Sequence, residues 1–143
     1  MEKKVIFQEK EFYEISPEGK ARLIGSRCRR CGYVAFPPKI ICPACVTRNS
    51  MDRIQLSSKG KIDTFSVLHI GAPGFDVPYV LAWVVLDEGP KIISLITGVE
   101  PSEDFIEVGT KVEAVVEKIR EDEQGTEVIG YKFRPINRGK SAG

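Results

Sequence analysis

The chain has 143 residues, 42% of them hydrophobic and 29% charged, with a formal net charge of +1. This composition is typical of a soluble globular protein of one domain or two small ones, and it excludes a disordered or collagen-like chain. The longest strongly apolar run, 79–86, is too short to cross a bilayer, and the N-terminus lacks an apolar segment of signal-peptide length. We therefore expect a cytoplasmic protein without membrane contact.

The near-neutral net charge hides an asymmetry between the two parts of the chain. Residues 1–58 carry 11 Lys and Arg against 6 Asp and Glu, whereas residues 59–143 carry 10 against 14. The basic first part is compatible with an anionic small molecule or an acidic partner.

Residues 1–22 are polar and rich in Lys and Glu. Ser16 can cap a helix, Pro17 suits a first helical turn, and Glu18 favours the helix dipole. Gly19 follows too soon for a long helix. The preceding stretch, 3–15, places Ile6, Phe7, Lys10, Glu11 and Glu14 at mixed helical offsets. This stretch predicts a short helix, so we expect a short N-terminal helical segment.

Residues 23–50 hold every cysteine, in the two pairs Cys28/Cys31 and Cys42/Cys45. Two disulfides are one alternative, but secreted disulfide scaffolds usually spread their cysteines along the chain. Two Cys-x-x-Cys turns can instead present four sulfurs to one metal ion in a tetrahedral shell. Zinc is the expected ion and iron in a rubredoxin-like site is its rival. Because a four-thiolate shell is closed, we expect one structural zinc per chain and no catalytic role for it.

The two turns differ at the residue after the second cysteine. Gly32 in the first turn suits a left-handed backbone that points N–H groups at sulfur. Val46 occupies that place in the second turn, which predicts a strained or differently shaped turn.

The segment between the turns is a finger that carries aromatic residues and two prolines. Pro37 and Pro38 cannot donate to a β-ladder, so we expect an irregular edge. Phe36 with the prolines can form a flat apolar surface, and Lys39 beside it can meet a phosphate. The alternative is that Tyr33 and Phe36 only cover the metal.

The remainder has the texture of a β-domain: a connector at 51–58, a domain over 59–136 and a frayed tail at 137–143. Alternating or continuous apolar residues predict five strands, at 61–70, 79–87, 91–98, 111–121 and 127–136. A loop with one helical turn is expected at 100–110, between the third and fourth strands. Five strands with this connection are the layout of an OB-fold barrel, so the predicted fold is mostly β.

A long loop marked by glycine and proline, 69–80, joins the first two strands. It can place Phe75, Pro78 and Tyr79 on one face near the finger. The alternative is that Phe75 and Tyr79 belong to the barrel core, which for Tyr79 is an equally good interpretation. The single histidine, His69, can act as a general base or, more simply, bond to backbone at the loop entry.

The combination of "CRRCGYVAFPPKIICPAC", the strand-rich segment that begins "SKGKIDTF" and the later "EVGTKVEAVVEK" resembles a known family. Its members join an N-terminal helical segment, a rubredoxin-like zinc ribbon and a C-terminal OB-fold, and were long known only as a domain of unknown function. The resemblance covers about residues 20–135. It implies acyl-CoA metabolism, as a scaffold and part of a shared CoA site for thiolases such as acetoacetyl-CoA thiolase and for HMG-CoA synthase, without independent catalysis.

Coenzyme A offers an adenine ring, a thin apolar pantetheine arm and several phosphates, which aromatic, apolar and basic side chains can meet. With the resemblance in view, the candidate acyl-CoA-binding residues are Phe36, Pro37, Pro38, Lys39, Phe75, Pro78, Tyr79, His69, Arg29 and Arg30.

Two other functions compete with a non-catalytic scaffold. Zinc ribbons and OB-folds also bind single-stranded nucleic acid, but phosphate contacts dominate such affinity and the predicted barrel is net acidic. A stand-alone enzyme is disfavoured because the metal site is closed and the sequence has no recognisable nucleophile–base pair.

Overall fold

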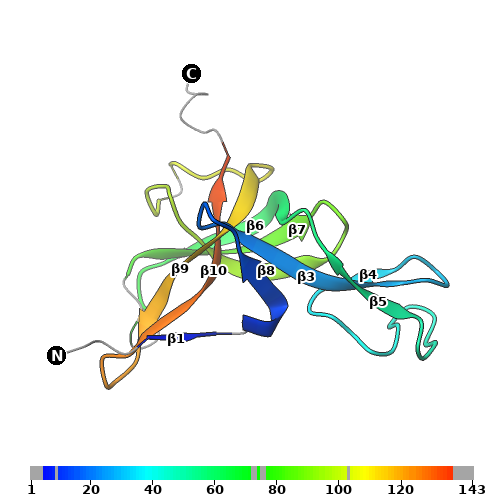
Figure 1. Cartoon of the computed structure of the whole chain (residues 1–143). Coiled ribbons are helices and arrows are strands. Elements are labelled where there is room, and N and C mark those ends of the chain that lie inside the picture. The colour runs from blue at the N-terminus through cyan, green and yellow to red at the C-terminus, as the bar shows by residue number, and fades with distance from the viewer. Residues whose placement is uncertain (1–4, 9, 72–73, 75–76, 103, 137–143) are drawn as a thin grey trace.

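Strands make up most of the chain, which confirms the predicted mostly-β fold. The computed structural model describes residues 5–8, 10–71, 74, 77–102 and 104–136, so the predicted tail at 137–143 lies outside the described residues. No helix in these ranges is long and apolar enough to span a bilayer. The elements (Figure 1) are β1 Val5–Phe7, the 3₁₀ turn η1 Lys10–Phe12, β2 Tyr13–Ile15, β3 Ala21–Cys28, β4 Val34–Ala35, β5 Met51–Gln55, β6 Lys59–Leu68, β7 Tyr79–Leu86, β8 Lys91–Ile96, β9 Lys111–Glu121 and β10 Glu127–Pro135.

Strands β6 to β10 close into the predicted five-stranded barrel. Hydrogen bonds link β10, β8, β7, β6 and β9 in that order, and an additional β10–β9 pairing completes the circle. All of these pairs are antiparallel except β10 with β8, which meet in parallel through Phe133 and Ile96. This is the strand order of an OB-fold.

The barrel core is built from side chains at alternate strand positions. In β7, Val80, Ala82, Val84 and Leu86 point inward and are at most 2% exposed. Phe133 of β10 is fully buried beside them. Burial of each large apolar side chain contributes about 1.5–3 kcal/mol, so this inner layer supplies most of the stability of the barrel.

The zinc ribbon forms an arm that projects away from the barrel (Figure 1). Its central strand, β3, begins in the barrel core, where Leu23 is fully buried, and ends at Cys28. The Ser58 hydroxyl holds β3 where it leaves the barrel, because it accepts a 2.7 Å hydrogen bond from the Leu23 N–H. We call residues 26–55, which lie beyond that junction, the zinc arm.

The predicted connector at 51–58 contains a strand instead. β5 pairs with β3 over five residue pairs, from Ile24↔Gln55 to Cys28↔Met51, and so completes the sheet of the arm. The sequence did not predict this strand, because it is a mostly polar edge strand with no buried residue and therefore has no alternating apolar pattern. The other predicted domain boundaries stay predictions.

The predicted N-terminal helical segment is wrong for the residues that the structure describes. They form β1, the short η1 and β2, and β2 joins β3 in a hairpin. The helix-start signal belongs to the hairpin turn: Ser16 Oγ accepts from the Lys20 N–H at 3.1 Å, and Gly19 adopts a φ of 84°. Serine, proline and glycine favour tight turns as strongly as helix ends, which explains the helix-start signal. Of the helix predicted at 3–15, the described residues form only the 3₁₀ turn η1, between two short strands.

The loop between β8 and β9 contains turns but no helical turn at its described residues, contrary to expectation. Ile106, which is 5% exposed, anchors it to the core.

Strand β10 pairs with different strands along its length: β1 runs parallel to its first part, while β8 meets it only near its end. The first part of β10 is thus free of β8, and a groove described below opens there.

Candidate zinc centre and ligand groove

The four cysteine sulfurs form one cluster at the arm. All four lie within 4.8 Å of one another, with 3.7 Å between the sulfurs of Cys28 and Cys45 and 3.6 Å between those of Cys31 and Cys42. These distances exclude disulfides, which need about 2.05 Å. A tetrahedral zinc with Zn–S bonds of about 2.3 Å separates its sulfurs by about 3.8 Å, so the donor set fits zinc.

Both cysteine turns have the same backbone shape. In each turn the N–H of the second cysteine points at the sulfur of the first, at 3.5 and 3.4 Å. The residue after the second cysteine is left-handed in both, with φ of 83° at Gly32 and 57° at Val46. The second turn therefore has the same shape as the first, although a β-branched residue is disfavoured at a positive φ. Of the two predicted outcomes, a strained turn and a differently shaped turn, the structure shows the strained one.

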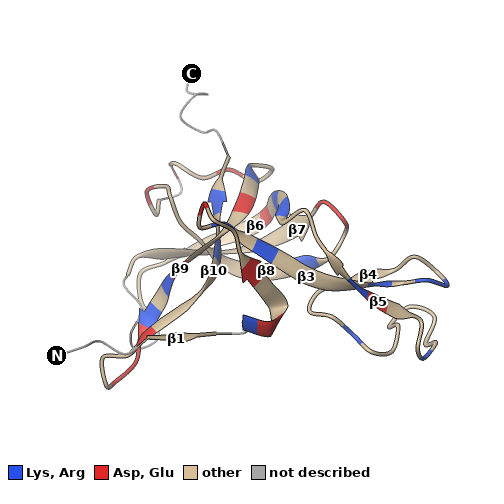
Figure 2. Cartoon of the chain, in the orientation of Figure 1, with Lys and Arg blue, Asp and Glu red and all other residues tan. Residues whose placement is uncertain are grey.

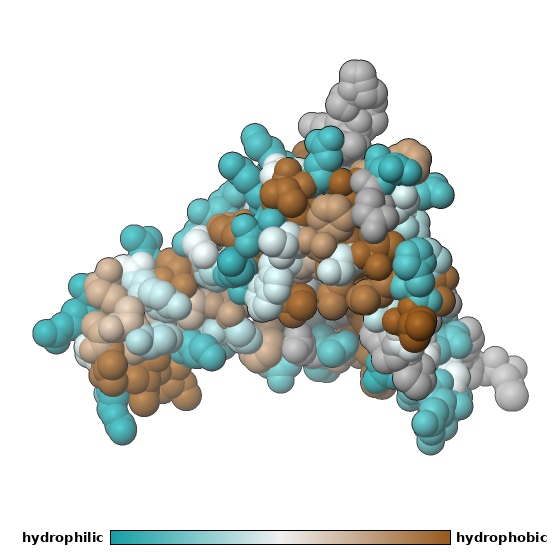
Figure 3. Space-filling model, turned by 180° about the vertical axis from the view of Figure 1, so that it is seen from behind, coloured by the Kyte–Doolittle hydropathy of each residue, from teal (hydrophilic) through white to brown (hydrophobic). Residues whose placement is uncertain are grey.

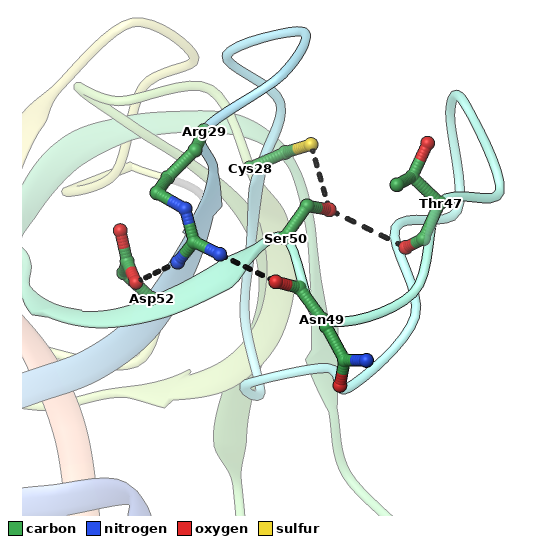
Figure 4. A network of polar contacts seen from close by, with 6 residues as sticks. All are labelled: Cys28, Arg29, Thr47, Asn49, Ser50 and Asp52. Carbon is green, nitrogen blue, oxygen red and sulfur yellow. Dashed lines mark hydrogen bonds and ion pairs between the residues drawn. The ribbon is translucent and has the colours of Figure 1, made fainter.

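Two hydroxyl groups approach the sulfurs from the segment that follows the second turn, and Figure 4 shows that of Ser50 beside Cys28. Ser50 Oγ lies 3.2 Å from Cys28 Sγ and 3.3 Å from the Thr47 carbonyl oxygen, so its proton can reach either acceptor. Thr47 Oγ1 lies 3.2 Å from Cys45 Sγ. Such partners orient metal-binding sulfurs and stabilise their thiolate form.

The thiols do not ionise equally in the absence of a cation. The Ser50 hydroxyl, followed by the Cys31 N–H, lowers the pKa of Cys28 to about 6. The pKa of Cys31 is raised to about 12: the Tyr33 N–H favours its thiolate, but desolvation and the neighbouring sulfurs oppose it. A divalent cation eases this conflict because its two positive charges stabilise the thiolate form of the sulfurs that bind it. The site holds one structural zinc, and when bound that zinc supplies a rigid cross-link and no open coordination position.

Arg29, a predicted acyl-CoA residue, is part of the arm itself. Its guanidinium group forms an ion pair with Asp52 of β5 and donates a hydrogen bond to the Asn49 carbonyl oxygen (Figure 4). It thereby ties the end of β3 to the segment after the second turn. Arg30, the next residue, is exposed.

A groove with a volume of about 550 Å³ lies over the outer face of β7 and β8, between the finger and β10. Its lining residues are Gln8, Phe36, Pro37, Tyr79, Leu81, Trp83, Lys91, Ile92, Ile93, Ser94, Leu95, Ile119, Gly130 and Tyr131. Most of them are apolar, and Trp83 and Ile93 remain 42% and 48% exposed. This size falls within the range of small-molecule sites, about 300–1,000 Å³.

The structure brings three of the predicted acyl-CoA residues together in this groove: Phe36, Pro37 and Tyr79. Tyr79 is half-buried on the outer face of β7, so its alternative place in the barrel core is wrong. Six candidates lie outside the groove lining, namely Pro38, Lys39, His69, Pro78, Arg29 and Arg30. Phe75 lies outside the described residues. For all of these residues a role in binding stays a prediction.

Phe36 does more than line the groove. Its ring contacts Tyr131 of β10 at a centroid distance of 5.9 Å and Phe12 at 6.3 Å, both edge to face. Tyr131 in turn contacts Tyr13 and Phe133. The finger thus packs against the barrel and the N-terminal segment, and the alternative that Phe36 only covers the metal is wrong.

The remaining lining residues were missed although β7 carries a signal for them. The run 79–86 is apolar at every position, yet a barrel of one sheet buries only one face of each strand. The outer residues Leu81 and Trp83 therefore need another surface to cover them. Sequence alone could have flagged this second apolar face, but not that the finger forms its opposite wall.

Comparisons with known proteins agree with this architecture. Residues 19–49 match the family described as ChsH2, rubredoxin-like zinc ribbon domain, and residues 53–117 match ChsH2, C-terminal OB-fold domain. A DUF35 domain-containing scaffold protein of Pyrococcus furiosus is 47% identical over 120 residues, covering 82% of this chain and 85% of that protein. The benzoylsuccinyl-CoA thiolase subunit BbsA of Thauera aromatica is 32% identical over 133 residues, covering 92% and 90%.

A solved structure adds a likeness in three dimensions. A chain of the Ltp2-ChsH2(DUF35) aldolase superposes with a TM-score of 0.61 at 30% sequence identity, covering 80% of this chain and 84% of that one.

Proposed function

Since the chain belongs to the DUF35 family, in which a rubredoxin-like zinc ribbon precedes an OB-fold, we propose that it is a non-catalytic accessory subunit which associates with a thiolase-fold enzyme and binds part of an acyl-CoA. Two relatives support the partner class, one named as a thiolase subunit and one solved as part of an aldolase complex. An enzyme of the acetoacetyl-CoA thiolase or HMG-CoA synthase type is the partner we favour. The cytoplasmic location expected from the sequence stays a prediction.

The groove between the finger and β7–β8 is the observation that carries the acyl-CoA part of the proposal. Its apolar walls, formed by residues such as Phe36 and Trp83, suit the thin pantetheine arm or the acyl chain. An apolar groove that stays partly exposed is also a surface that binding can cover.

The phosphates of CoA need cations that the groove supplies poorly. Among the lining residues that the structure describes, the one cation is Lys91, and its Nζ is already 3.0 Å from Asp63 Oδ2. We therefore assign the phosphates to cations at the rim or on the partner enzyme, as in a site shared between two proteins. The closed zinc centre favours a non-catalytic role for this chain, because it offers no coordination position for a substrate.

Calorimetric titration of the purified chain with acetyl-CoA and acetoacetyl-CoA, with and without the acetoacetyl-CoA thiolase of the same organism, tests the proposal. The variant Ile93→Lys places a charge in the groove, and we expect it to weaken CoA thioester binding by about tenfold or more. Val108→Lys is the matched control, since Val108 is 64% exposed and lies outside the groove lining. It should bind as the wild type does.

Three results would overturn the proposal. One is that the chain binds neither the thiolase nor any CoA thioester, alone or together. Another is turnover of an acyl-CoA by the purified chain alone. The third is tight binding of single-stranded oligonucleotides at physiological salt without CoA binding, which would favour the nucleic-acid alternative.

A further inference from the structure

The end of the zinc arm exposes a group of apolar side chains. Ile40 is 82% exposed, Val46 73%, Tyr33 42% and Ile41 40%. We call these four residues the arm tip. Figure 3 shows hydrophobic residues gathered at this end of the molecule.

The zinc centre brings the four residues of the arm tip near one another. Each of the four residues lies within two positions of a cysteine ligand, and the four sulfurs lie within 4.8 Å of one another. A bridge between Ile41 and Arg48 closes the second turn around Val46. The metal therefore holds the tip in a fixed shape, which lowers the conformational cost of binding.

Val46 gives a second reason to regard the tip as functional. A β-branched residue at a φ of 57° is strained, and this side chain gains almost no burial within the chain. Glycine, which occupies the equivalent place in the first turn, would remove the strain. Retaining valine at this position is explained if its side chain is buried against another molecule.

Basic residues surround the tip. Residues 23–50 contain five Lys and Arg and no Asp or Glu, and Figure 2 shows basic residues along the arm. Arg29 is paired with Asp52, but Arg30, Lys39 and Arg48 have no ion-pair partner among the residues that the structure describes. The arm thus presents an apolar centre surrounded by basic side chains that form no ion pair with a described residue.

We propose that the arm tip docks into an apolar pocket rimmed by carboxylates on the partner enzyme, an inference that rests on the proposed function. Protein interfaces commonly combine an apolar centre with a polar rim, and complementary charge speeds and orients the encounter. The groove is then left for the ligand, so that one protein uses two separate surfaces, one for the acyl-CoA and one for the enzyme.

Other occupants fit the tip less well. A two-fold contact between copies of this chain would set Arg30, Lys39 and Arg48 against the same cations of the second copy. Single-stranded nucleic acid needs aromatic stacking platforms, whereas three of the four tip residues are aliphatic. A membrane surface would gain only a small apolar insertion and a few cation contacts.

Biolayer interferometry with the zinc-loaded full chain and the purified acetoacetyl-CoA thiolase of the same organism tests the docking surface. The double variant Ile40→Asp/Val46→Asn places at position 46 an asparagine, which tolerates a left-handed backbone. The dissociation constant of this variant for the thiolase should rise about 30-fold or more. Ile70→Asp, at an isoleucine that is 89% exposed on a barrel loop, is the matched control and should change binding less than about twofold. Unchanged zinc content and melting curves show that the variants are folded.

Charge reversal gives an independent readout. Arg30→Glu/Arg48→Glu should slow association about tenfold at low salt and remove most of its salt dependence. If the wild type binds the thiolase and the tip variant binds it with the same affinity, the docking proposal is wrong but the proposed function is not. Absence of thiolase binding by the wild type overturns both. Tip-dependent binding to phosphatidylserine vesicles, to oligonucleotides or to a second copy, in place of the thiolase, overturns the docking proposal.

Discussion

The zinc arm and the barrel are held together by different forces. The barrel buries a continuous set of side chains such as Val84, Leu86 and Phe133. The arm, in contrast, buries little apolar surface beyond Ala35 and two of its cysteines, Cys28 and Cys42. A segment with so small a core needs a metal to order it, whereas a closed barrel does not. Perturbing the metal and perturbing the core should therefore damage different parts of the chain.

The largest effect is expected from loss of a zinc ligand. Cys42 is a fully buried member of the sulfur cluster, and Cys42→Ser removes a thiolate that a serine hydroxyl replaces poorly. Structural zinc contributes about 10–16 kcal/mol to folding of such sites. We expect the variant to lose its zinc and residues 26–55 to lose amide protection, while 59–136 stay protected in hydrogen exchange.

Ala44→Ser is the matched control, because it places the same hydroxyl in the same turn at an exposed position that is not a ligand. It should retain one zinc per chain. If Cys42→Ser instead kept an ordered arm without metal, or unfolded the barrel to the same extent, the contrast between the two regions would be wrong.

The next largest effect is a cavity in the barrel. Phe133→Ala should lower the free energy of unfolding by about 3–5 kcal/mol, because Phe133 is fully buried and the space it fills cannot collapse completely. Urea denaturation measures the loss, with Phe105→Ala, at a phenylalanine that is 55% exposed, as control. Zinc content should stay at one per chain, since the cavity lies away from the sulfurs. Loss of zinc in Phe133→Ala would show that the arm depends on the barrel.

The same contrast explains which parts of the fold were predictable. The five barrel strands were located closely because their inward residues alternate, as in β8, where Ile92, Ser94 and Ile96 are buried. The cluster of four cysteines was predictable because Cys-x-x-Cys spacing requires only local geometry. The edge strand β5 has no buried residue, and nothing in its sequence separates it from a connector.

The groove was only half predictable, for a reason of sequence distance. The apolar outer face of β7 is visible as a continuous run, but its opposite wall depends on Phe36 meeting Tyr131, 95 positions away in the chain. No local pattern encodes such a contact. In the N-terminal segment the helix-start signal at Ser16 was misleading, because Ser16 and Gly19 favour a tight turn as well as a helix end.

A smaller effect is expected at the hydroxyl beside the sulfurs. Ser50→Ala removes the group 3.2 Å from Cys28 Sγ that lowers the pKa of this thiol, so the thiolate becomes harder to form. We expect zinc affinity to fall about tenfold, as measured by competition with a chelator at neutral pH. Ser66→Ala, at an exposed serine of β6, should leave the affinity unchanged. An unchanged affinity in Ser50→Ala would mean that the backbone N–H groups and the Thr47 hydroxyl are enough to set the properties of the sulfurs.

The smallest and most specific effects come from exchanging the residues that distinguish the two cysteine turns. A Cβ added at Gly32 meets nothing within 4 Å, so Gly32→Ala reports backbone strain alone and should destabilise the zinc-bound chain by about 1 kcal/mol. Val46→Gly relieves strain but gives the unfolded chain more conformational freedom. Because these effects partly cancel, the free energy of unfolding should rise by less than about 1 kcal/mol. Urea titration of the zinc-loaded proteins measures both changes. Because Val46 also belongs to the arm tip, Val46→Gly should stabilise the isolated chain and weaken its binding to the thiolase at the same time. A gain in stability without a loss of binding would leave the strained valine without an explanation in docking.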